Sequence, residues 1–229
     1  MKHYPIVLMD ADGTLFDFDR AEERALGQVF AWGNIPDTPE NRERYIRINK
    51  GYWAAFERGE VTKEQLQERR FGDLLEEISL PGNGRAYNDK YLDFLSQGTD
   101  LIPGALEVCR KLAEKSRLVI VTNGISRVQH GRMDFSPIKV YFEHIFVSED
   151  VGYQKPQKEY FDFCLHAMGD PDIADCLMVG DSLASDMTGG INAGIDVCWY
   201  NPKHLPKPEG MTLTWEIDAL EQLLPQENP

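Results

Sequence analysis

The chain has 229 residues, 42% of them hydrophobic, and a formal net charge of −14 at pH 7. This length provides one sizeable hydrophobic core, or one core with a small second module. The negative charge argues against a nucleic-acid polymer as a partner, because the phosphate backbone would be repelled. No apolar stretch approaches the roughly 20 residues that span a bilayer, so we expect a cytoplasmic protein with a small-molecule ligand and no membrane partner.

Short apolar runs along the chain predict buried strands, and helix-like stretches such as residues 104–115 and 159–168 lie between them. Strands that alternate with helices indicate a parallel sheet covered on both faces. Such a sheet carries its chemistry just beyond the carboxyl ends of its strands. The predicted strands are residues 6–9, 118–121, 144–147, 176–179 and 197–200.

The stretch between residues 19 and 96 interrupts this alternation. It contains no strand-like run, it is charged, and its pattern is helical, so it predicts an insertion of three to five helices. The segments NIPDTPEN and SLPGNGR supply helix breaks within it. We therefore divide the chain into a core of residues 1–16 and 99–229 and a helical domain of residues 17–98.

The cysteines are far apart in the sequence and form no C-x-x-C pair. Each one lies in an apolar segment that reads as a helix or a strand. This pattern predicts buried free thiols rather than disulfides or a zinc site. The four residues are Cys109, Cys164, Cys176 and Cys198.

The first predicted strand runs directly into acidic residues. Asp10 ends it, and Asp12 follows two positions later, which places both carboxylates on the same side of the chain. Gly13 then allows a tight turn. Two carboxylates held this close are unfavourable unless a cation lies between them or one is protonated. An EF-hand calcium loop does not fit, because Leu15 and Ala21 occupy its glycine and glutamate positions; a solvated acidic turn stays open as the simpler alternative.

Polar side chains also follow later strands of the predicted sheet. Because the carboxyl ends of parallel strands meet at one edge, we expect these groups to converge there. A single Thr or Asp at a strand end is most often a helix cap, and we interpret Ser182 in this way first. The converging residues are Thr122, Asn123, Lys155, Asp181 and, one helical turn further, Asp186.

Taken in chain order, these residues resemble the four motifs of the haloacid dehalogenase (HAD) superfamily. The resemblance covers nearly the whole chain and implies a Rossmann-like three-layer α/β core with a parallel sheet. It also implies that the insertion after the first strand is a helical C1-type cap. The segments LFDFD, NKGYW and VSEDVGYQKP are more narrowly similar to pyrimidine 5′-nucleotidases of the YjjG type. The motifs read Asp10-Ala-Asp12-Gly-Thr-Leu, Thr122-Asn-Gly, Lys155-Pro and Gly180-Asp181-Ser-x3-Asp186.

The resemblance implies a phosphomonoester hydrolase that forms an aspartyl-phosphate. Asp10 would be the nucleophile. Asp12, next to the phosphate, would protonate the leaving oxygen and then deprotonate the attacking water. Mg²⁺ would bind the Asp10 carboxylate, the Asp12 backbone carbonyl and Asp181, since oxygen ligands suit this ion.

The remaining motif residues would hold the phosphate. Gly13 and Asn123 would contribute to this site, the Thr122 hydroxyl would contact phosphate oxygens, and Lys155 would neutralise charge. Asp186 would orient Lys155 or a metal-bound water. Asp17 and Asp19, just after the first motif, are expected to belong to the hinge of the cap.

Several other functions stay open from the sequence. A sugar-phosphate phosphatase or a phosphomutase of the same superfamily would share these motifs, whereas Asp12 argues against a haloacid dehalogenase. A non-catalytic phosphate-binding or interaction module is an alternative of a different class. We expect a monomer or a homodimer.

Substrate choice is expected to come from the cap, because the core motifs contact only the phosphoryl group. Asn49, Trp53 and Phe56 share one face of a predicted cap helix. An amide beside an indole suits a flat polar ring, by hydrogen bonding and stacking respectively. Asn49 and Trp53 are therefore the predicted specificity residues, with Phe56 more simply part of the cap interior, and the predicted ligand is a pyrimidine nucleoside monophosphate.

Overall fold

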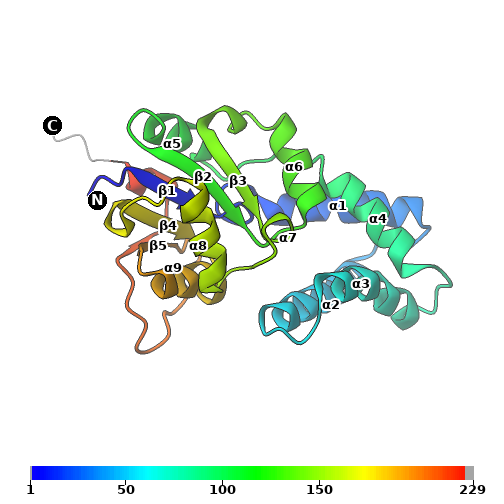
Figure 1. Ribbon diagram of the computed structural model, residues 1–229. Helices are drawn as coiled ribbons and strands as arrows, with labels where there is room; N and C mark the ends of the chain where they lie inside the picture. Colours follow the sequence, from blue (N-terminus) through cyan, green and yellow to red (C-terminus); the bar gives the residue numbers. More distant parts are fainter. Residues whose placement is uncertain (1, 225–229) are drawn as a thin grey trace. The chain divides into compact units, whose positions relative to one another are not determined.

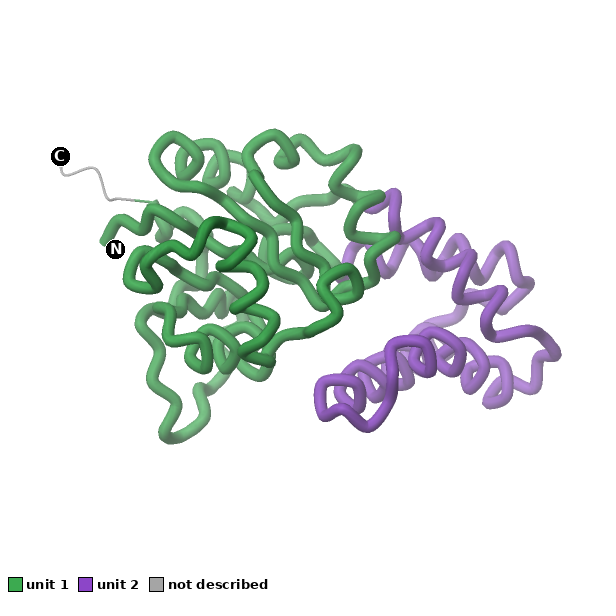
Figure 2. Tube along the Cα trace, viewed as in Figure 1, with its two compact units in different colours: residues 1–18, 99–229 green, residues 19–98 purple. Residues whose placement is uncertain are grey.

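The computed structural model describes residues 2–224 (Figure 1). The chain divides into two compact units, one of residues 1–18 with 99–229 and one of residues 19–98 (Figure 2). We call them the core and the insertion. The sequence had led us to expect these boundaries after residues 16 and 98.

The core is built on one parallel sheet of six strands, in the order β3-β2-β1-β4-β5-β6. The first strand is central, because Leu8 pairs with Val119 on one side and with Met178 on the other. All five predicted strands are confirmed. The strands are β1 (Ile6–Met9), β2 (Arg117–Thr122), β3 (Phe142–Val147), β4 (Cys176–Gly180), β5 (Asp196–Tyr200) and β6 (Trp215–Ile217).

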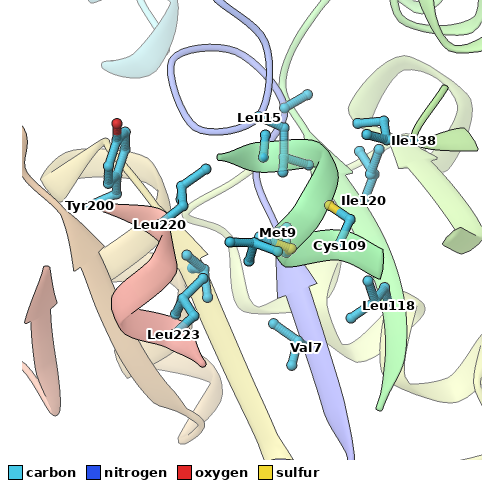
Figure 3. Packing of buried hydrophobic residues seen from close by; sticks show 14 of the residues in the cluster. Val7, Met9, Leu15, Cys109, Leu118, Ile120, Ile138, Tyr200, Leu220 and Leu223 are labelled. Carbon is cyan, nitrogen blue, oxygen red and sulfur yellow. The ribbon is translucent and has the colours of Figure 1, made fainter. Parts of the chain in front are cut away.

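Helices cover both faces of this sheet, as the resemblance implied, and the predicted Rossmann-like three-layer core is confirmed. Side chains of β1 alternate between the faces because successive residues of a strand point in opposite directions. Val7 and Met9 pack with α5 (Ala105–Leu112), α6 (Ser126–Phe135) and the 3₁₀-helix η4 (Leu220–Leu223) (Figure 3). Ile6 and Leu8 pack with α8 (Lys158–Ala167) and α9 (Thr188–Ala193) on the opposite face.

Short helical turns complete the core. They fill the connections that follow strands or precede them. These turns are η1 (Lys139–Tyr141), α7 (Ser148–Val151), η2 (Ile173–Asp175) and the π-helix η3 (Leu183–Met187). The four cysteines are buried and free, which confirms that prediction.

The two chain segments that join the core to the insertion are hydrogen-bonded to each other within the core. The Asp17 N–H donates to the carbonyl of Asp100 over 3.0 Å, and the Ile102 N–H donates to the carbonyl of Leu15 over 2.9 Å. The departing and returning segments therefore form a short antiparallel ladder.

The insertion folds into four helices, within the predicted range of three to five. Local signals start three of them, since Thr38, Thr62 and Asn83 each accept a hydrogen bond from a backbone N–H of the first turn. At Thr62 the side chain of Gln65 also returns to the cap backbone, which completes a capping box. The helices are α1 (Phe18–Trp32), α2 (Pro39–Glu57), α3 (Lys63–Glu77) and α4 (Gly84–Leu95).

A buried polar network crosses the interior of the insertion. Arg70 is 1% exposed and donates to Asn88 over 2.8 Å and to Asn49 over 3.1 Å. Asn49 in turn donates to the carboxylate of Glu22 over 2.9 Å. The guanidinium also lies 4.8 Å from the centre of the Tyr91 ring. One neutral amide thus links a buried cation to a buried anion, and the network as a whole joins α1, α2, α3 and α4.

Among residues 2–224, no helix combines the length and the apolar character needed to cross a bilayer.

Candidate active site

The polar residues predicted at the strand ends come together at one edge of the core sheet. Asp10 directly follows β1, and its N–H donates to Val179 of β4 over 2.9 Å, so the ladder fixes its backbone. Thr122 is the last residue of β2, and Asp181 directly follows β4. Because these strands are adjacent and parallel, their carboxyl ends present the three side chains to the same region.

Lys155 links these groups from a loop that follows α7. Its ammonium donates to Asp10 Oδ1 and to Asp186 Oδ1, each over 2.6 Å, and to the Val121 carbonyl over 2.8 Å. The side chain is 1% exposed. An ammonium has three protons to donate, so this geometry uses all of them and leaves Lys155 in a single orientation.

Asn123 holds the backbone of the same lysine. Its side-chain oxygen accepts from the Lys155 N–H over 2.9 Å, and its side-chain nitrogen donates to the Lys155 carbonyl over 2.8 Å. The Lys155–Pro156 peptide bond is cis. In this structure the Asn123 amide group therefore positions Lys155, a role that the sequence did not suggest for it.

Asp186 reaches the site from the π-helix η3. Its Oδ2 accepts from the Ser182 N–H over 3.0 Å, while its Oδ1 pairs with Lys155. The Ser182 hydroxyl accepts from Ser185 over 3.2 Å, which confirms our interpretation of Ser182 as a helix cap. Gly180 makes room for Asp186, because a Cβ there would lie 2.2 Å from its Oδ2.

The site carries more negative than positive charge. Burial raises the pKa of Asp10 well above its usual range, and the nearby Asp186 and Asp181 raise it further against the effect of Lys155. Burial, with Asp186 next, also raises the pKa of Asp181 to about 7. Burial by itself lowers the pKa of Lys155, but Asp10 and Asp186 outweigh it and raise the value. Three carboxylates around one ammonium leave a position that favours a further cation.

The donor set at this edge suits a hard divalent ion. One carboxylate oxygen from each of Asp10, Asp181 and Asp186 lies within 4.8 Å of the others. Both oxygens of Asp186 already accept hydrogen bonds, so Asp10 and Asp181 are the better ligands. Gly13, at a φ of +84°, permits this approach, because a Cβ there would lie 2.6 Å from Asp181 Oδ2. All-oxygen donors are those that Mg²⁺ prefers.

Asp12 is held by two residues that sequence reasoning missed. Arg132 donates from Nη1 to Asp12 Oδ1, and Gln129 donates from Nε2 to Asp12 Oδ2 over 2.5 Å. Both come from α6, three positions apart, so they share a helix face. In the sequence, the available signal was a glutamine and an arginine three positions apart in the helix that follows the Thr122-Asn123-Gly124 segment. The Thr122 hydroxyl itself is buried and accepts from the Gly124 N–H over 3.0 Å.

The predicted specificity residues lie on α2 of the insertion. Trp53 is partly exposed and packs edge-on against Phe56, with ring centres 5.8 Å apart, and Phe56 is buried. Asn49 is 3% exposed and uses its amide in the network between Glu22 and Arg70. Of this pair, Trp53 is the side chain with exposed surface for a ligand.

Comparisons with known proteins agree on one family. The family model for haloacid dehalogenase-like hydrolases matches residues 4–194. The chain is 35% identical to the pyrimidine 5′-nucleotidase YjjG of Escherichia coli (strain K12), over 95% of both chains. It is 33% identical to the pyrimidine 5′-nucleotidase PynA of Streptococcus pneumoniae (strain ATCC BAA-255 / R6), over 96% of this chain and 94% of that protein.

A solved structure is similar over almost the full length. It is that of the HAD-hydrolase YfnB from Bacillus subtilis bound to magnesium, with a TM-score of 0.92 and 40% identity, covering 97% of each chain. This likeness agrees with the arrangement of strands and helices described above.

Replacing Lys155 by methionine tests the electrostatic account of this site. Lys155→Met would leave the Asp10 and Asp186 carboxylates buried without their cation, so we expect the free energy of unfolding in EDTA to fall by about 3 kcal/mol near neutral pH. The folded variant should bind protons that the unfolded chain releases, so the loss should be larger at about pH 8 than at about pH 5. Urea unfolding at several pH values measures both.

Lys139→Met is the matched control. Lys139 forms an ion pair with Asp134 over 2.6 Å, but 49% of its side chain is exposed, so its loss should amount to less than ~1 kcal/mol with little dependence on pH. Equal losses for the two variants would contradict the charge balance described for the site.

Proposed function

Because the chain belongs to the haloacid dehalogenase-like hydrolases, we propose that it is a magnesium-dependent phosphatase of pyrimidine nucleoside 5′-monophosphates. The observation that carries the proposal is the position of Asp10. Its carboxylate lies at a strand end, 2.6 Å from a buried ammonium, with a second carboxylate two residues later. This arrangement supports covalent phosphoryl transfer to Asp10.

In the first step an oxygen of Asp10 attacks the phosphorus atom of the substrate. A bond forms between this oxygen and phosphorus, and the bond between phosphorus and the nucleoside 5′-oxygen breaks. Asp12 gives its proton to the leaving oxygen, so that an alcohol departs rather than an alkoxide. The product on the enzyme is an aspartyl-phosphate.

In the second step Asp12 takes a proton from a water molecule as the water attacks the aspartyl-phosphate. The bond between phosphorus and the Asp10 oxygen breaks, which releases inorganic phosphate and restores both carboxyl groups. Splitting one difficult displacement into two lowers each barrier. The same residue serves as acid and then as base, so its position matters in both steps.

The phosphoryl group carries negative charge throughout, and the site offers groups that balance it. Lys155 is fixed beside Asp10 by its three hydrogen bonds, so it needs no reorganisation when charge develops. The Thr122 hydroxyl and the backbone at Gly13 and Asn123 would contact the other phosphate oxygens. Asp186 would keep Lys155 in place, since it accepts one of the three bonds.

Magnesium would be held by the carboxylates of Asp10 and Asp181 and by the backbone carbonyl of Asp12. When bound, it would neutralise charge between an anionic nucleophile and an anionic substrate. The clustering of Asp10 with Asp181 against Gly13 supports this assignment, as does the magnesium-bound YfnB structure.

The nucleotide assignment rests on the relatives YjjG and PynA, which are named as pyrimidine 5′-nucleotidases, and on the partly exposed Trp53 in the insertion. An indole face can stack on a pyrimidine ring regardless of its substituents. Asn49 would then contribute indirectly, by fixing the position of α2, since its amide is buried between Glu22 and Arg70. UMP, dUMP and dTMP are the expected substrates.

Asp10→Asn tests the covalent step. An amide is not an anionic nucleophile, so we expect turnover of UMP to fall by at least about 10³-fold, with the fold retained in circular dichroism. Acid quenching of the wild type during turnover of ³²P-labelled substrate should trap an acid-stable, hydroxylamine-sensitive phosphoenzyme that the variant lacks. Asp134→Asn, an exposed aspartate of the same unit, is the control. Near-wild-type activity of Asp10→Asn would exclude the mechanism.

Chelation tests the metal. We expect EDTA to abolish turnover and excess Mg²⁺ to restore it, because the single charge of Lys155 does not balance the three carboxylates of Asp10, Asp181 and Asp186. Asp181→Ala should raise the Mg²⁺ concentration for half-maximal activation by at least about tenfold, in line with the loss of one ligand. Its melting temperature in EDTA should not fall, because the substitution removes a like charge close to Asp10 and Asp186. Full activity of the wild type in EDTA is the contrary result.

Trp53→Ala tests the substrate assignment. Loss of a stacking partner should lower kcat/KM for UMP by about tenfold, while p-nitrophenyl phosphate, which depends mainly on the core, should change by less than about twofold. Trp32→Ala is the control, since Trp32 is an exposed tryptophan of the same insertion. Equal losses on both substrates would remove the stacking role. A preference for sugar phosphates over every pyrimidine nucleotide would remove the substrate assignment and leave the phosphatase mechanism intact.

A further inference from the structure

Both oxygens of the Asp12 carboxylate accept hydrogen bonds from side chains of α6 in the core. Arg132 donates to Oδ1 and Gln129 donates to Oδ2, the latter over 2.5 Å. Two separate donors on two oxygens fix both the direction and the rotation of a carboxylate. Asp12 itself is only partly buried, with 26% of its side chain exposed. The two hydrogen bonds therefore hold the carboxylate and leave part of it accessible.

Both donors are unusual residues to find so deeply buried. The Arg132 side chain is 0% exposed, and Gln129 is 1% exposed. Within the described part of the chain, Arg132 Nε and Nη2 and Gln129 Oε1 have no hydrogen-bond partner. Burying polar atoms without partners is unfavourable. A protein with an apolar residue of similar volume at such a position is often at least as stable. Stability alone is therefore a poor explanation for this pair, and the hydrogen bonds that the two side chains do make go to Asp12.

The surroundings are shaped to hold the pair in place. The Arg132 guanidinium lies 5.0 Å from the centre of the Phe16 ring, and Phe16 is tied to the Asp12 turn because its carbonyl accepts from the Gly13 N–H over 2.9 Å. Gly124 leaves space for the glutamine, since a Cβ there would lie 2.0 Å from Gln129 Nε2. The turn after β1 and the turn after β2 are thus both adapted to these two side chains.

We infer that Arg132 and Gln129 are positioning residues that hold Asp12 for proton transfer at the nucleoside 5′-oxygen and at the attacking water. This inference rests on the proposed function. In this role each residue acts through the orientation of one carboxylate and not through a contact of its own with the phosphoryl group. A misplacement of about 1 Å can lower a rate by about 100-fold. We therefore expect these two hydrogen bonds to raise the rate of every step that uses Asp12.

Substrates with different leaving groups distinguish a role in positioning Asp12 from a purely structural role. A nucleoside alkoxide is a poor leaving group and needs a proton from Asp12, whereas p-nitrophenolate leaves without one. Hydrolysis of the aspartyl-phosphate needs Asp12 as base whichever substrate formed it. A variant with a misplaced Asp12 should therefore form phosphoenzyme rapidly from p-nitrophenyl phosphate and then release phosphate slowly.

The experiment is stopped-flow and steady-state kinetics of Arg132→Met in the full-length protein with Mg²⁺. We expect kcat for UMP to fall about 10- to 100-fold, and a burst of p-nitrophenol close to one equivalent that the wild type does not show. Arg132→Lys should recover part of the loss, because it keeps a cationic donor. Gln129→Met should show the same pattern with smaller changes. The burst counts active sites, so a partly unfolded sample does not imitate the result.

A double-mutant cycle with Asp12→Ala completes the test. If Arg132 acts only through Asp12, Arg132→Met should cause no further loss of turnover in the Asp12→Ala background. Arg127→Met, an exposed arginine on the same helix, is the control and should behave as the wild type. Additive losses in the cycle, or a loss without a burst, would overturn the inference. A wild type that hydrolyses no phosphomonoester would instead overturn the proposed function.

Discussion

The site depends on one buried ammonium. Lys155 lies where three parallel strands end, and its protons go to Asp10, Asp186 and the Val121 carbonyl. Without it, burial and mutual repulsion would protonate the carboxylates or expel them from the interior. The loop geometry at Asn123, the glycine at position 180 and the π-helix at Leu183–Met187 all serve to bring the partners of this lysine into reach.

The two units use buried cations in different ways. In the core, Lys155 and Arg132 each bind an acidic side chain that has a chemical task in the proposed mechanism. In the insertion, Arg70 is linked to the anion Glu22 through the neutral amide of Asn49 and through the Tyr91 ring, whose hydroxyl donates to Glu22. That relay joins α1, α2 and α3, and the bond from Arg70 to Asn88 adds α4. Asn49, which the sequence pattern places on a ligand-facing surface, is therefore part of the interior. Polar interiors of this kind favour one arrangement of helices over others, because each hydrogen bond between helices joins one particular donor to one particular acceptor.

The sequence predicted the elements whose signal is local. Continuous apolar runs identified β1 to β5, and strand-end polar residues identified the edge where Asp10, Thr122 and Asp181 meet. It missed β6, which has only three residues and a charged centre at Glu216. It also missed Arg132 and Gln129, because a polar residue on a helix face reads as solvated until the fold shows that this face covers Asp12. The sequence likewise does not show which side chains of other helices lie next to Asn49. It was predicted as a ligand contact, whereas its amide bonds to Glu22 of α1 and Arg70 of α3.

The strand order has a consequence for synthesis of the protein. β1 is the first strand to be made and the central strand of the sheet, yet its neighbours begin only at Arg117 and Cys176. Until then a strand with four buried apolar residues has no partner and is exposed to association with other chains. The insertion, made of consecutive helices with local contacts, can form in the meantime. We therefore expect the helices of the insertion to form during synthesis before β1 pairs with its neighbours in the sheet.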